Sequence, residues 1–514
     1  MKRLGKCLAA LTACLLLASC ASGRKQEGKQ VVTVDPRKTP EINGGIFEGW
    51  GTSLCWWANR IGYSDTLSRL AAEAFCDPEK GLGLNILRFN IGGGDDPSHD
   101  HIRRTDSMMP GYWKNPRRDE ASGSWSWEYD WTQDANQRNV LSHCMEVYGQ
   151  DLITEAFSNS PPYFMTNSGC SSGAETASMN NLRDDAYGDF AQYLADVAEH
   201  FSKEWGITFQ SLSPMNEPDT AYWQALSPKQ EGCHFDPGAS QSRILEAAAE
   251  KLEEKGLAGI LIAGTDETGI GAQARSLSRL SEEALAVISR VDTHAYNGSG
   301  REQLRRMALD LGKNLWMSEV DGGETTGGSA GEMGAGLWLA REILADLNEL
   351  NPSAWILWQV IDSHISRDGY LGRKDTGMVD TRGGYWGTAV ADHDREQLIL
   401  TMKYYVYGQF TRYIRPGCRL IPTGGGTVAA EDPQRRRLVL VAVNEGGSEK
   451  LLQADLSAYG AAAAPGADIQ MIRTSGGMAR GEHWAELPGP ALGEGGFSAS
   501  LAPYSVTTFL IPLE

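Results

Sequence analysis

The sequence predicts a (β/α)8 barrel followed by a small β-sandwich, on three observations. Between residues 45 and 414, short apolar runs alternate with longer amphipathic runs, which is the pattern of parallel strands joined by helices. Two of the apolar runs end in a glutamate. After Tyr413 the helical periodicity gives way to short β-type runs separated by glycine- and proline-rich turns, which is typical of an antiparallel domain.

Eight strand-then-helix units support the barrel. The predicted strands are 46–52, 85–90, 152–158, 208–215, 259–264, 291–296, 314–319 and 354–360. The predicted helices are 64–75, 132–148, 184–205, 241–255, 274–289, 301–311, 331–349 and 396–413. A doubly wound open sheet is the alternative, but no G-x-G-x-x-G turn follows the first strand, which argues against it.

The first 44 residues have the features of a targeting segment and a tether. Three basic residues precede the apolar run 7–18, which is too short to span a bilayer. The tetrapeptide 17–20, Leu-Ala-Ser-Cys, is similar to the bacterial lipobox, in which cleavage precedes a cysteine that becomes lipid-modified, here Cys20. The alternative is an ordinary secretory signal with a chance cysteine.

These features predict four segments. Residues 1–19 are expected to be a lipoprotein signal peptide, and 20–44 a tether with a strand at 31–34 that contributes to the sandwich. Residues 45–414 are the predicted barrel and 415–514 the sandwich. We therefore expect an exported protein, anchored by lipid to the bacterial membrane at the cell surface or in the periplasm.

The charge of the chain restricts its partners. The formal net charge is -19, and loss of residues 1–19 would remove three basic groups and move it to -22. Such an acidic surface repels phosphate backbones, which excludes nucleic acid as an expected partner. We expect a monomer that acts on a polysaccharide or oligosaccharide and contacts the membrane only through its anchor.

Cysteine and histidine spacing predict neither a zinc site nor a cofactor. The cysteines beyond the anchor region are Cys55, Cys76, Cys144, Cys170, Cys233 and Cys418, too widely spaced for a small disulfide framework or a zinc motif. A bridge between Cys55 and Cys170 is a hypothesis, since both lie in loops expected on one face. His294 has no second histidine at ligand spacing, so we expect no metal there.

Two strand-end glutamates are the candidates for catalysis. Glu217 follows strand 208–215 and precedes Pro218, which cannot donate to a sheet ladder; Glu319 ends strand 314–319. In a barrel these strand ends converge on one face. A pair of carboxylates across a sugar can hydrolyse a glycosidic bond. The alternatives are a capping or surface acid for Glu217 and an ion pair for Glu319.

Other strand ends carry groups suited to sugars. Arg88 ends the second strand, and an arginine beside Glu319 is expected to lower the pKa of that carboxyl, as suits a nucleophile, unless it forms only a structural salt bridge. Asn216 can hydrogen-bond a sugar hydroxyl. The further candidates for substrate binding are Trp50, Trp56, Trp57, Asn159, Tyr163, His294, Tyr296 and Trp358, with core packing as the alternative for each tryptophan.

Six segments in order resemble glycoside hydrolase family 30. They are GWGTSLCWWANRIG (49–62), LNILRFNIGGGD (84–95), SPMNEP (213–218), THAYNG (293–298), WMSEVDGG (316–323) and YYVYGQFTRYIRPG (404–417). The first is most similar to the endo-β-1,6-galactanase branch. The resemblance implies a barrel with an attached β-sandwich, retention of anomeric configuration, Glu217 as acid/base and Glu319 as nucleophile. It also places Arg88, Asn216, Tyr296 and Trp358 around the reacting sugar.

The expected function is therefore endo-hydrolysis of β-1,6-galactan, such as arabinogalactan side chains, through a glycosyl-enzyme. Within the enzyme class the alternatives are β-1,6-glucan, glucuronoxylan and glucosylceramide hydrolysis. From another class, the alternative is a carbohydrate-binding surface lipoprotein without turnover. The intact pair Glu217 and Glu319 argues against that alternative, because a buried acid pair costs stability and gives a binder nothing.

Overall fold

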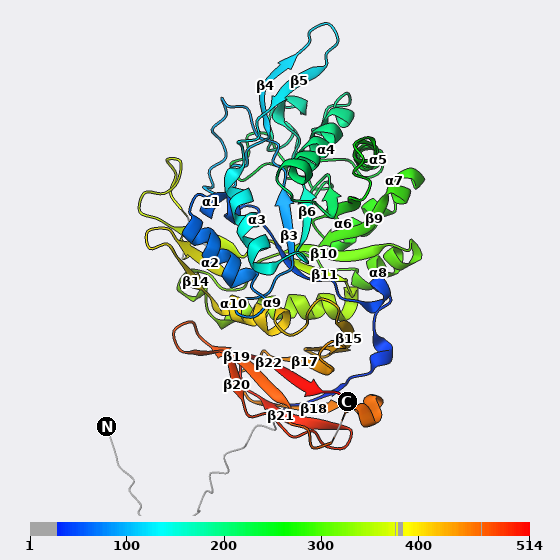
Figure 1. The fold of residues 1–514 in the computed structure, drawn as a ribbon, viewed down its shortest axis with the longest axis vertical. Helices are drawn as coiled ribbons and strands as arrows, with labels where there is room; N and C mark the ends of the chain where they lie inside the picture. Colours follow the sequence, from blue (N-terminus) through cyan, green and yellow to red (C-terminus); the bar gives the residue numbers. More distant parts are fainter. Residues whose placement is uncertain (1–27, 376, 379–383, 464) are drawn as a thin grey trace, which may run out of the picture.

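The computed structural model describes residues 28–514 except 376, 379–383 and 464. It shows a closed parallel barrel in the order β2-β3-β6-β7-β8-β9-β10-β11, surrounded by helices, with further sheets of C-terminal strands at one end (Figure 1). The predicted (β/α)8 barrel is confirmed, and the open sheet is excluded. The export signal and Cys20 lie outside the described residues and stay predictions, which the mass of the mature N-terminus would test.

The barrel strands coincide with the predicted ones. They are β2 (Gly49–Ser53), β3 (Ile86–Asn90), β6 (Ile153–Phe157), β7 (Ser211–Ser213), β8 (Leu261–Glu267), β9 (Ile288–His294), β10 (Asn314–Val320) and β11 (Ala354–Leu357). Nearly every residue in them is buried, because helices cover the outside of the sheet and side chains fill its interior. The strand β7 is shorter than predicted and ends four residues before Glu217.

The surrounding helices also follow the prediction, except that the first helix was not predicted and two of the predicted helices differ in extent. The helices are α1 (Trp57–Ile61), α2 (Asp65–Phe75), α3 (Ala135–Tyr148), α4 (Tyr187–Glu204), α5 (Ala239–Glu254), α6 (Ile270–Leu277), α7 (Glu282–Val287), α8 (Arg301–Asp310), α9 (Met333–Ala345) and α10 (Met402–Thr411). Among the described residues, none of them is long and apolar enough to cross a membrane.

The two differences have local causes. The predicted helix 274–289 is divided, because Ser281 accepts a hydrogen bond from the Ala284 N–H and begins α7. The predicted helix 396–413 begins instead with a strand, β14 (Gln397–Leu400). This strand pairs with β13 (Ala389–Asp392), which pairs with β12 (Ile361–Ile365), so that a small sheet precedes α10.

The barrel interior has an apolar lower layer and a charged upper layer. Ile86, Trp316 and Ile356 form the apolar layer. The guanidinium of Arg290 lies 3.4 Å from the centroid of the Trp316 ring and marks the boundary. Above it lie the buried charged groups toward the C-terminal strand ends, including Arg88. This charged layer supports the site described below.

The C-terminal strands form two facing sheets. One holds β1 (Gly28–Thr33), β18 (Lys450–Asp455) and β21 (Gly496–Leu501). The other holds β15 (Arg419–Gly424), β16 (Thr427–Asp432), β17 (Arg437–Asn444), β22 (Ser505–Pro512), β19 (Gln470–Gly476) and β20 (Gly481–Leu487). Their inner faces share an apolar core that includes Val32, Leu440 and Phe509.

The N-terminal segment joins this sandwich, since β1 pairs in parallel with β18 along its whole length. The larger sheet also contacts the barrel. Thr508 Oγ1 donates to the Gln409 carbonyl of α10 at 2.9 Å, and Gln409 Nε2 donates to Thr474 Oγ1 at 2.9 Å. Both contacts are buried, so the sandwich packs on the outside of the barrel through α10.

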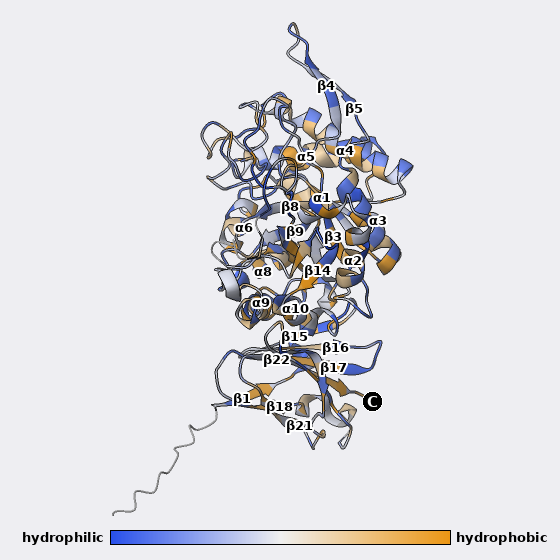
Figure 2. Cartoon of the chain, turned by 90° about the vertical axis from the view of Figure 1, so that its left-hand side faces the viewer, coloured by the Kyte–Doolittle hydropathy of each residue, from blue (hydrophilic) through white to orange (hydrophobic). Residues whose placement is uncertain are grey.

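A hairpin that the sequence analysis did not predict follows β3. It consists of β4 (Trp113–Arg118) and β5 (Trp125–Tyr129), and it projects from the end of the barrel opposite the sandwich as a largely hydrophilic ribbon (Figure 2). Trp113 and Trp125 of the hairpin pack against Phe164 with ring centroids 5.1 and 5.3 Å away.

The pairing of β1 with the sandwich gives a stability prediction. Val32 is 3% exposed and Val31 is 63% exposed on the same strand. Val32→Asp would bury an unpaired carboxylate and is expected to lower the free energy of unfolding by about 3 kcal/mol or more. Val31→Asp, the matched control, should change it by less than about 1 kcal/mol. Urea denaturation of both variants provides the measurement, and equal losses would contradict the packing of β1.

Candidate active site

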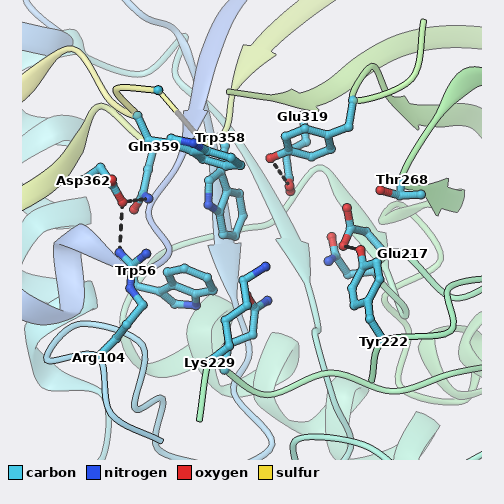
Figure 3. A pocket seen from close by; sticks show the side chains of 15 residues that line it. Trp56, Arg104, Glu217, Tyr222, Lys229, Thr268, Glu319, Trp358, Gln359 and Asp362 are labelled. Atoms are coloured by element: carbon cyan, nitrogen blue, oxygen red, sulfur yellow. Dashed lines mark hydrogen bonds and ion pairs between the residues drawn. The ribbon is translucent and has the colours of Figure 1, made fainter. Parts of the chain in front are cut away.

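A cleft of about 870 Å³ opens at the C-terminal ends of the barrel strands. Of the predicted site residues, it is lined by Trp56, Asn216, Glu217, Tyr296, Glu319 and Trp358. Its other walls include Arg104, Tyr222, Lys229, Thr268, Gln359, Asp362 and Trp386. The side chains of Glu217 and Glu319 are both directed into this cleft, with Trp56, Trp358 and Arg104 along another part of its wall (Figure 3).

Glu217 occupies a turn after β7. Its φ is 47°, in the left-handed region that costs a non-glycine residue about 1 kcal/mol. The turn is held by three hydrogen bonds: the Glu217 N–H donates to the Asp266 carbonyl at 2.8 Å, and the Glu217 carbonyl accepts from Thr220 Oγ1 at 2.8 Å and Trp223 Nε1 at 3.0 Å. The backbone is thus fixed so that the carboxyl points into the cleft.

Glu319 is aimed by an irregularity in β10. Met317 pairs with Thr293 of β9, but Glu319 pairs with His294, so Ser318 is an extra residue. With strict alternation, Glu319 would face the helices as Met317 does. The bulge instead turns both Ser318 and Glu319 inward, where Ser318 Oγ donates to Asp266 at 2.6 Å.

His294 links the two glutamates. Its Nδ1 lies 3.2 Å from Glu217 Oε1 and 3.4 Å from Glu319 Oε1, and its Nε2 lies 3.2 Å from Asp266 Oδ1. One carboxylate oxygen of each glutamate and a ring nitrogen of His294 all lie within 4.8 Å of one another. The sequence analysis placed His294 at the site but did not predict this bridging position.

Arg88 lies beneath Glu319 and is shared among three carboxylates. Its Nη1 donates to Glu319 Oε2 at 3.3 Å, its Nε donates to Glu155 Oε1 at 2.8 Å, and its Nη2 pairs with Asp266. The guanidinium carbon is also 4.3 Å from the Phe157 ring centroid. Arg88 is fully buried, so these contacts are not weakened by solvent.

The ionisation of the site follows from this network. Burial acts to lower the pKa of His294, but the charges of Glu319 and Asp266 outweigh it and raise the pKa to about 10. His294 is therefore an imidazolium, which donates hydrogen bonds and does not ligate a metal. Burial acts to raise the pKa of Glu217, yet its hydrogen bonds from His294 and Tyr222 lower it.

Arg88 acts to lower the pKa of Glu319 as expected, but the expectation of a lowered pKa overall is wrong for this site. Burial raises the pKa of Glu319 to about 7, and the nearby charge of Glu217 adds to this effect, while His294 and Arg88 oppose it. Arg88 does not lower the pKa of Glu319 enough to offset burial, because Glu155 and Asp266 also pair with its guanidinium. Below about pH 7, the pair of glutamates thus holds one proton between them.

Six of the predicted binding residues do not line the cleft. Arg88 and His294 are fully buried and contact the two glutamates instead. The other four are packed elsewhere. Trp50 is fully buried between the barrel and α10, 5.9 Å from Tyr407, and its Nε1 donates to the Ile414 carbonyl at 2.7 Å. Trp57 begins α1 and is fully buried against Phe75. Both are core residues, and their assignment to substrate binding is corrected.

Asn159 and Tyr163 are the other two. Asn159 is 1% exposed, and its Nδ2 contacts Asn90 Oδ1 at 3.5 Å below the cleft surface. The Tyr163 ring packs against Trp113 of the hairpin with centroids 5.3 Å apart. Neither lines the cleft, because the hairpin and the loop after β6 turn these side chains into their own packing.

The expected disulfide is also absent, since all six cysteines of the described residues are free. Cys55 contacts Asn159, whereas Cys170 contacts His101 and Ser172.

Several functional side chains were missed by the sequence analysis. Tyr222 donates a hydrogen bond to Glu217 Oε2, and Asp266 contacts both Arg88 and His294. The signal for Asp266 was present, because it lies near the end of β8, but the predicted strand stopped at residue 264. Tyr222 lies in a loop with no periodic pattern, so only the tertiary structure reveals it.

Aromatic rings form the rest of the cleft wall. Trp56 and Trp358 meet edge to face with centroids 5.1 Å apart, and Tyr296 stacks on Trp386 at 5.7 Å. Arg104 covers Trp56 at 4.8 Å and pairs with Asp362 at 3.0 Å (Figure 3). Such apolar faces beside hydrogen-bonding groups suit a pyranose, which has both C–H faces and hydroxyls.

Comparisons with known proteins agree with this geometry. Residues 45–270 match the family model described as O-Glycosyl hydrolase family 30. An endo-β-1,6-galactanase from Hypocrea rufa is 31% identical over 96% of this chain and 97% of its own length. An exo-β-1,6-galactobiohydrolase from Bifidobacterium longum is 25% identical over 90% of this chain and 38% of its own length.

Solved structures share the fold. A conserved exported protein from Bacteroides fragilis has a TM-score of 0.72 at 18% identity, covering 94% of this chain and 100% of that chain. The catalytic domain of xylanase C from Talaromyces cellulolyticus has a TM-score of 0.69 at 18% identity, with the same coverage of both chains.

The raised pKa of Glu319 gives a stability prediction. The folded state retains a proton up to about pH 7 that the unfolded carboxyl releases near its ordinary value of 4.5. The stability from this proton is present below pH 4.5 and is lost as the pH rises through 7, a loss of up to about 3 kcal/mol. We expect Glu319→Gln to be more stable than the wild type at pH 8 and not at pH 4.5, as measured by denaturant unfolding.

The control is Glu146→Gln, whose side chain is 80% exposed. A stability difference for Glu319→Gln that does not depend on pH would show that the proton is not held at this site.

Proposed function

Because the chain belongs to glycoside hydrolase family 30, we propose that it is an endo-acting hydrolase of β-1,6-linked galactan that retains anomeric configuration. The hydrolase class follows from the family. The observation that carries the mechanism is the placement of Glu217 and Glu319, which have carboxylate oxygens within 4.8 Å of one another across the cleft.

This separation favours double displacement. Retaining enzymes place their carboxyl groups about 5 to 5.5 Å apart, whereas inverting enzymes leave about 6.5 to 9.5 Å for a water molecule. The nearest carboxylate oxygens of Glu217 and Glu319 lie within 4.8 Å of each other, which is closer to the retaining arrangement. In the proposed mechanism, one glutamate attacks the anomeric carbon as a carboxylate, while the other protonates the departing oxygen as a carboxylic acid.

The surroundings support Glu319 as the nucleophile. Its Oε1 accepts from Tyr296 Oη at 3.0 Å and its Oε2 accepts from Arg88 at 3.3 Å, so both oxygens are fixed in orientation. These two donors hold the attacking carboxylate in one place, which reduces the entropy lost on reaching the transition state. The same donors stabilise the carboxylate when it is released from the ester.

Glu217 then acts as acid and base. Substrate entry must place the shared proton on Glu217, and His294 Nδ1, which faces both carboxylates, lies beside the short path between them. Once Glu319 is esterified it carries no charge. Hydrogen bonds from His294 and Tyr222 lower the pKa of Glu217 against the effect of burial. Glu217 is then the ionised base that activates water.

The galactan specificity rests on the similarity to the Hypocrea rufa enzyme, which extends over nearly the whole of both chains. A second relative with a β-1,6-galactan activity in its name supports the same linkage. Endo action is proposed from the first of these relatives.

The substrate proposal predicts release of reducing sugar from de-arabinosylated β-1,6-galactan. We expect little or no release from β-1,6-glucan, glucuronoxylan or glucosylceramide under the same conditions. A ladder of oligosaccharides early in the reaction would indicate endo action. Inactivity on galactan with turnover of another polymer would remove the specificity, while leaving the hydrolase class intact.

The assignment of roles predicts different azide products from two variants. With an activated β-galactobioside, Glu217→Ala should form the intermediate and yield the β-glycosyl azide, because azide needs no base. Glu319→Ala should yield the α-glycosyl azide, since azide replaces the nucleophile. Each variant should lose at least about 10²-fold in activity on galactan. Glu146→Gln is the exposed control and should keep wild-type activity. If Glu217→Ala gave the α-azide and Glu319→Ala the β-azide, the roles of the two glutamates would be reversed.

A further inference from the structure

We propose that Asp95, His99, His101 and Cys170 form a binding site for a divalent transition metal, with Zn²⁺ as the ion best suited to these ligands. One ligand atom from each of these side chains lies within 4.8 Å of the others. The site lies apart from the two glutamates, and nothing in the proposed hydrolysis uses it. The proposal of a metal site does not depend on whether galactan is the substrate.

The four ligands come from two loops at the same end of the barrel. Asp95, His99 and His101 follow β3 in the spacing D-x-x-x-H-x-H, and Cys170 follows β6. The sequence analysis expected no zinc site because it looked for closely spaced cysteines and histidines. The barrel brings the thiol to the histidines across 69 residues of chain.

The distances are close to those of a tetrahedral site. Cys170 Sγ is 3.7 Å from His101 Nε2, and Asp95 Oδ2 is 3.1 Å from His99 Nδ1. Ligand atoms that lie about 2.0 to 2.3 Å from a tetrahedral zinc are separated by about 3.3 to 3.8 Å. Small side-chain rotations suffice to close the set around one ion.

One of the ligands, His101, has a polar atom that its protein neighbours do not satisfy. His101 Nδ1 is buried and makes no hydrogen bond with any described residue, although Asp95 lies 3.5 Å away.

Cys170 is arranged as an acceptor. The side chain is 1% exposed, and its sulfur receives the Leu226 N–H at 3.4 Å and lies 3.2 Å from Ser172 Oγ. Donors directed at a sulfur are the outer contacts that stabilise a metal-bound thiolate. Asp95 is oriented in the same way, because its Oδ1 accepts from the Ser171 N–H at 2.9 Å and leaves Oδ2 to face the histidines.

The chemistry of the ligand set indicates a structural ion. Sulfur, imidazole and carboxylate together suit zinc and disfavour magnesium or calcium, which prefer oxygen. Four protein ligands leave no open position for substrate. A cavity of about 310 Å³ bordered by Asp95, His99 and His101 provides the entry path. The ion would fasten the loop after β3 to the loop after β6 beside the cleft.

The experiment uses the full mature chain, stripped of metal with a chelator and titrated with Co²⁺ and then Zn²⁺. We expect saturation at about one Co²⁺ per chain, with the strong visible bands of tetrahedral coordination and a thiolate-to-cobalt charge-transfer band. Zn²⁺ should remove these bands and raise the thermal midpoint, because an ion that binds only the folded state stabilises it.

The variants His101→Gln and Cys170→Ser should lose the cobalt spectrum and the thermal shift. The matched control is His143→Gln, since His143 contacts the carboxylates of Asp65 and Glu146 but no second histidine or thiol; it should behave as the wild type. Absence of tetrahedral cobalt bands in the wild type, or an unchanged spectrum in both ligand variants, would overturn the proposal. The wild-type titration decides the question even if a variant fails to fold.

Discussion

The buried guanidinium of Arg88 is the interaction on which the arrangement of the site depends. It contacts Glu155, Asp266 and Glu319 at once, from strands β6, β8 and β10. Three acids inside a barrel repel one another unless a cation lies among them, and removing that cation would leave uncompensated buried charge. Arg88 therefore fixes the spacing of the strand ends as well as the position of Glu319.

The charged layer as a whole explains why the two glutamates retain a proton. The cations are Arg88, Arg290 and His294, and the facing acids are Glu155, Asp266, Asp292, Glu217 and Glu319. Acids outnumber cations, so the surplus negative charge is unfavourable at these buried positions. The raised pKa of Glu319 relieves part of it. Esterification of this carboxyl by the sugar would remove its negative charge altogether. The surplus of negative charge therefore favours the proposed glycosyl-enzyme.

The sequence alone was sufficient to predict the barrel and the polar residues at the ends of its strands. The eight strands came from the alternation of short apolar and longer amphipathic runs. The rule that barrel strands converge at their C-terminal ends, together with the family resemblance, pointed to the two glutamates, Arg88, Asn216 and Tyr296. The aromatic residues were less predictable. Trp50 and Trp57 are near Trp56 in sequence, but both faces of β2 are buried, so alternation does not distinguish a side chain that faces the helices from one that faces the cleft.

Contacts between distant loops could not be predicted from one sequence. The bulge at Ser318, the bridging position of His294 and the meeting of Cys170 with His101 depend on register and loop paths that carry no local pattern. For the same reason, the effect of Arg88 on Glu319 was misjudged, because the other two carboxylates that share its charge lie 67 and 178 positions away.

The most direct test of the account is to trap the covalent intermediate. A 2-deoxy-2-fluoro β-1,6-galactobioside with an activated leaving group should inactivate the enzyme and label one peptide. Mass spectrometry of the digested protein is predicted to find the sugar on the peptide that contains Glu319. A label on Glu217 or on another residue, or steady turnover with inversion and no label, would contradict it.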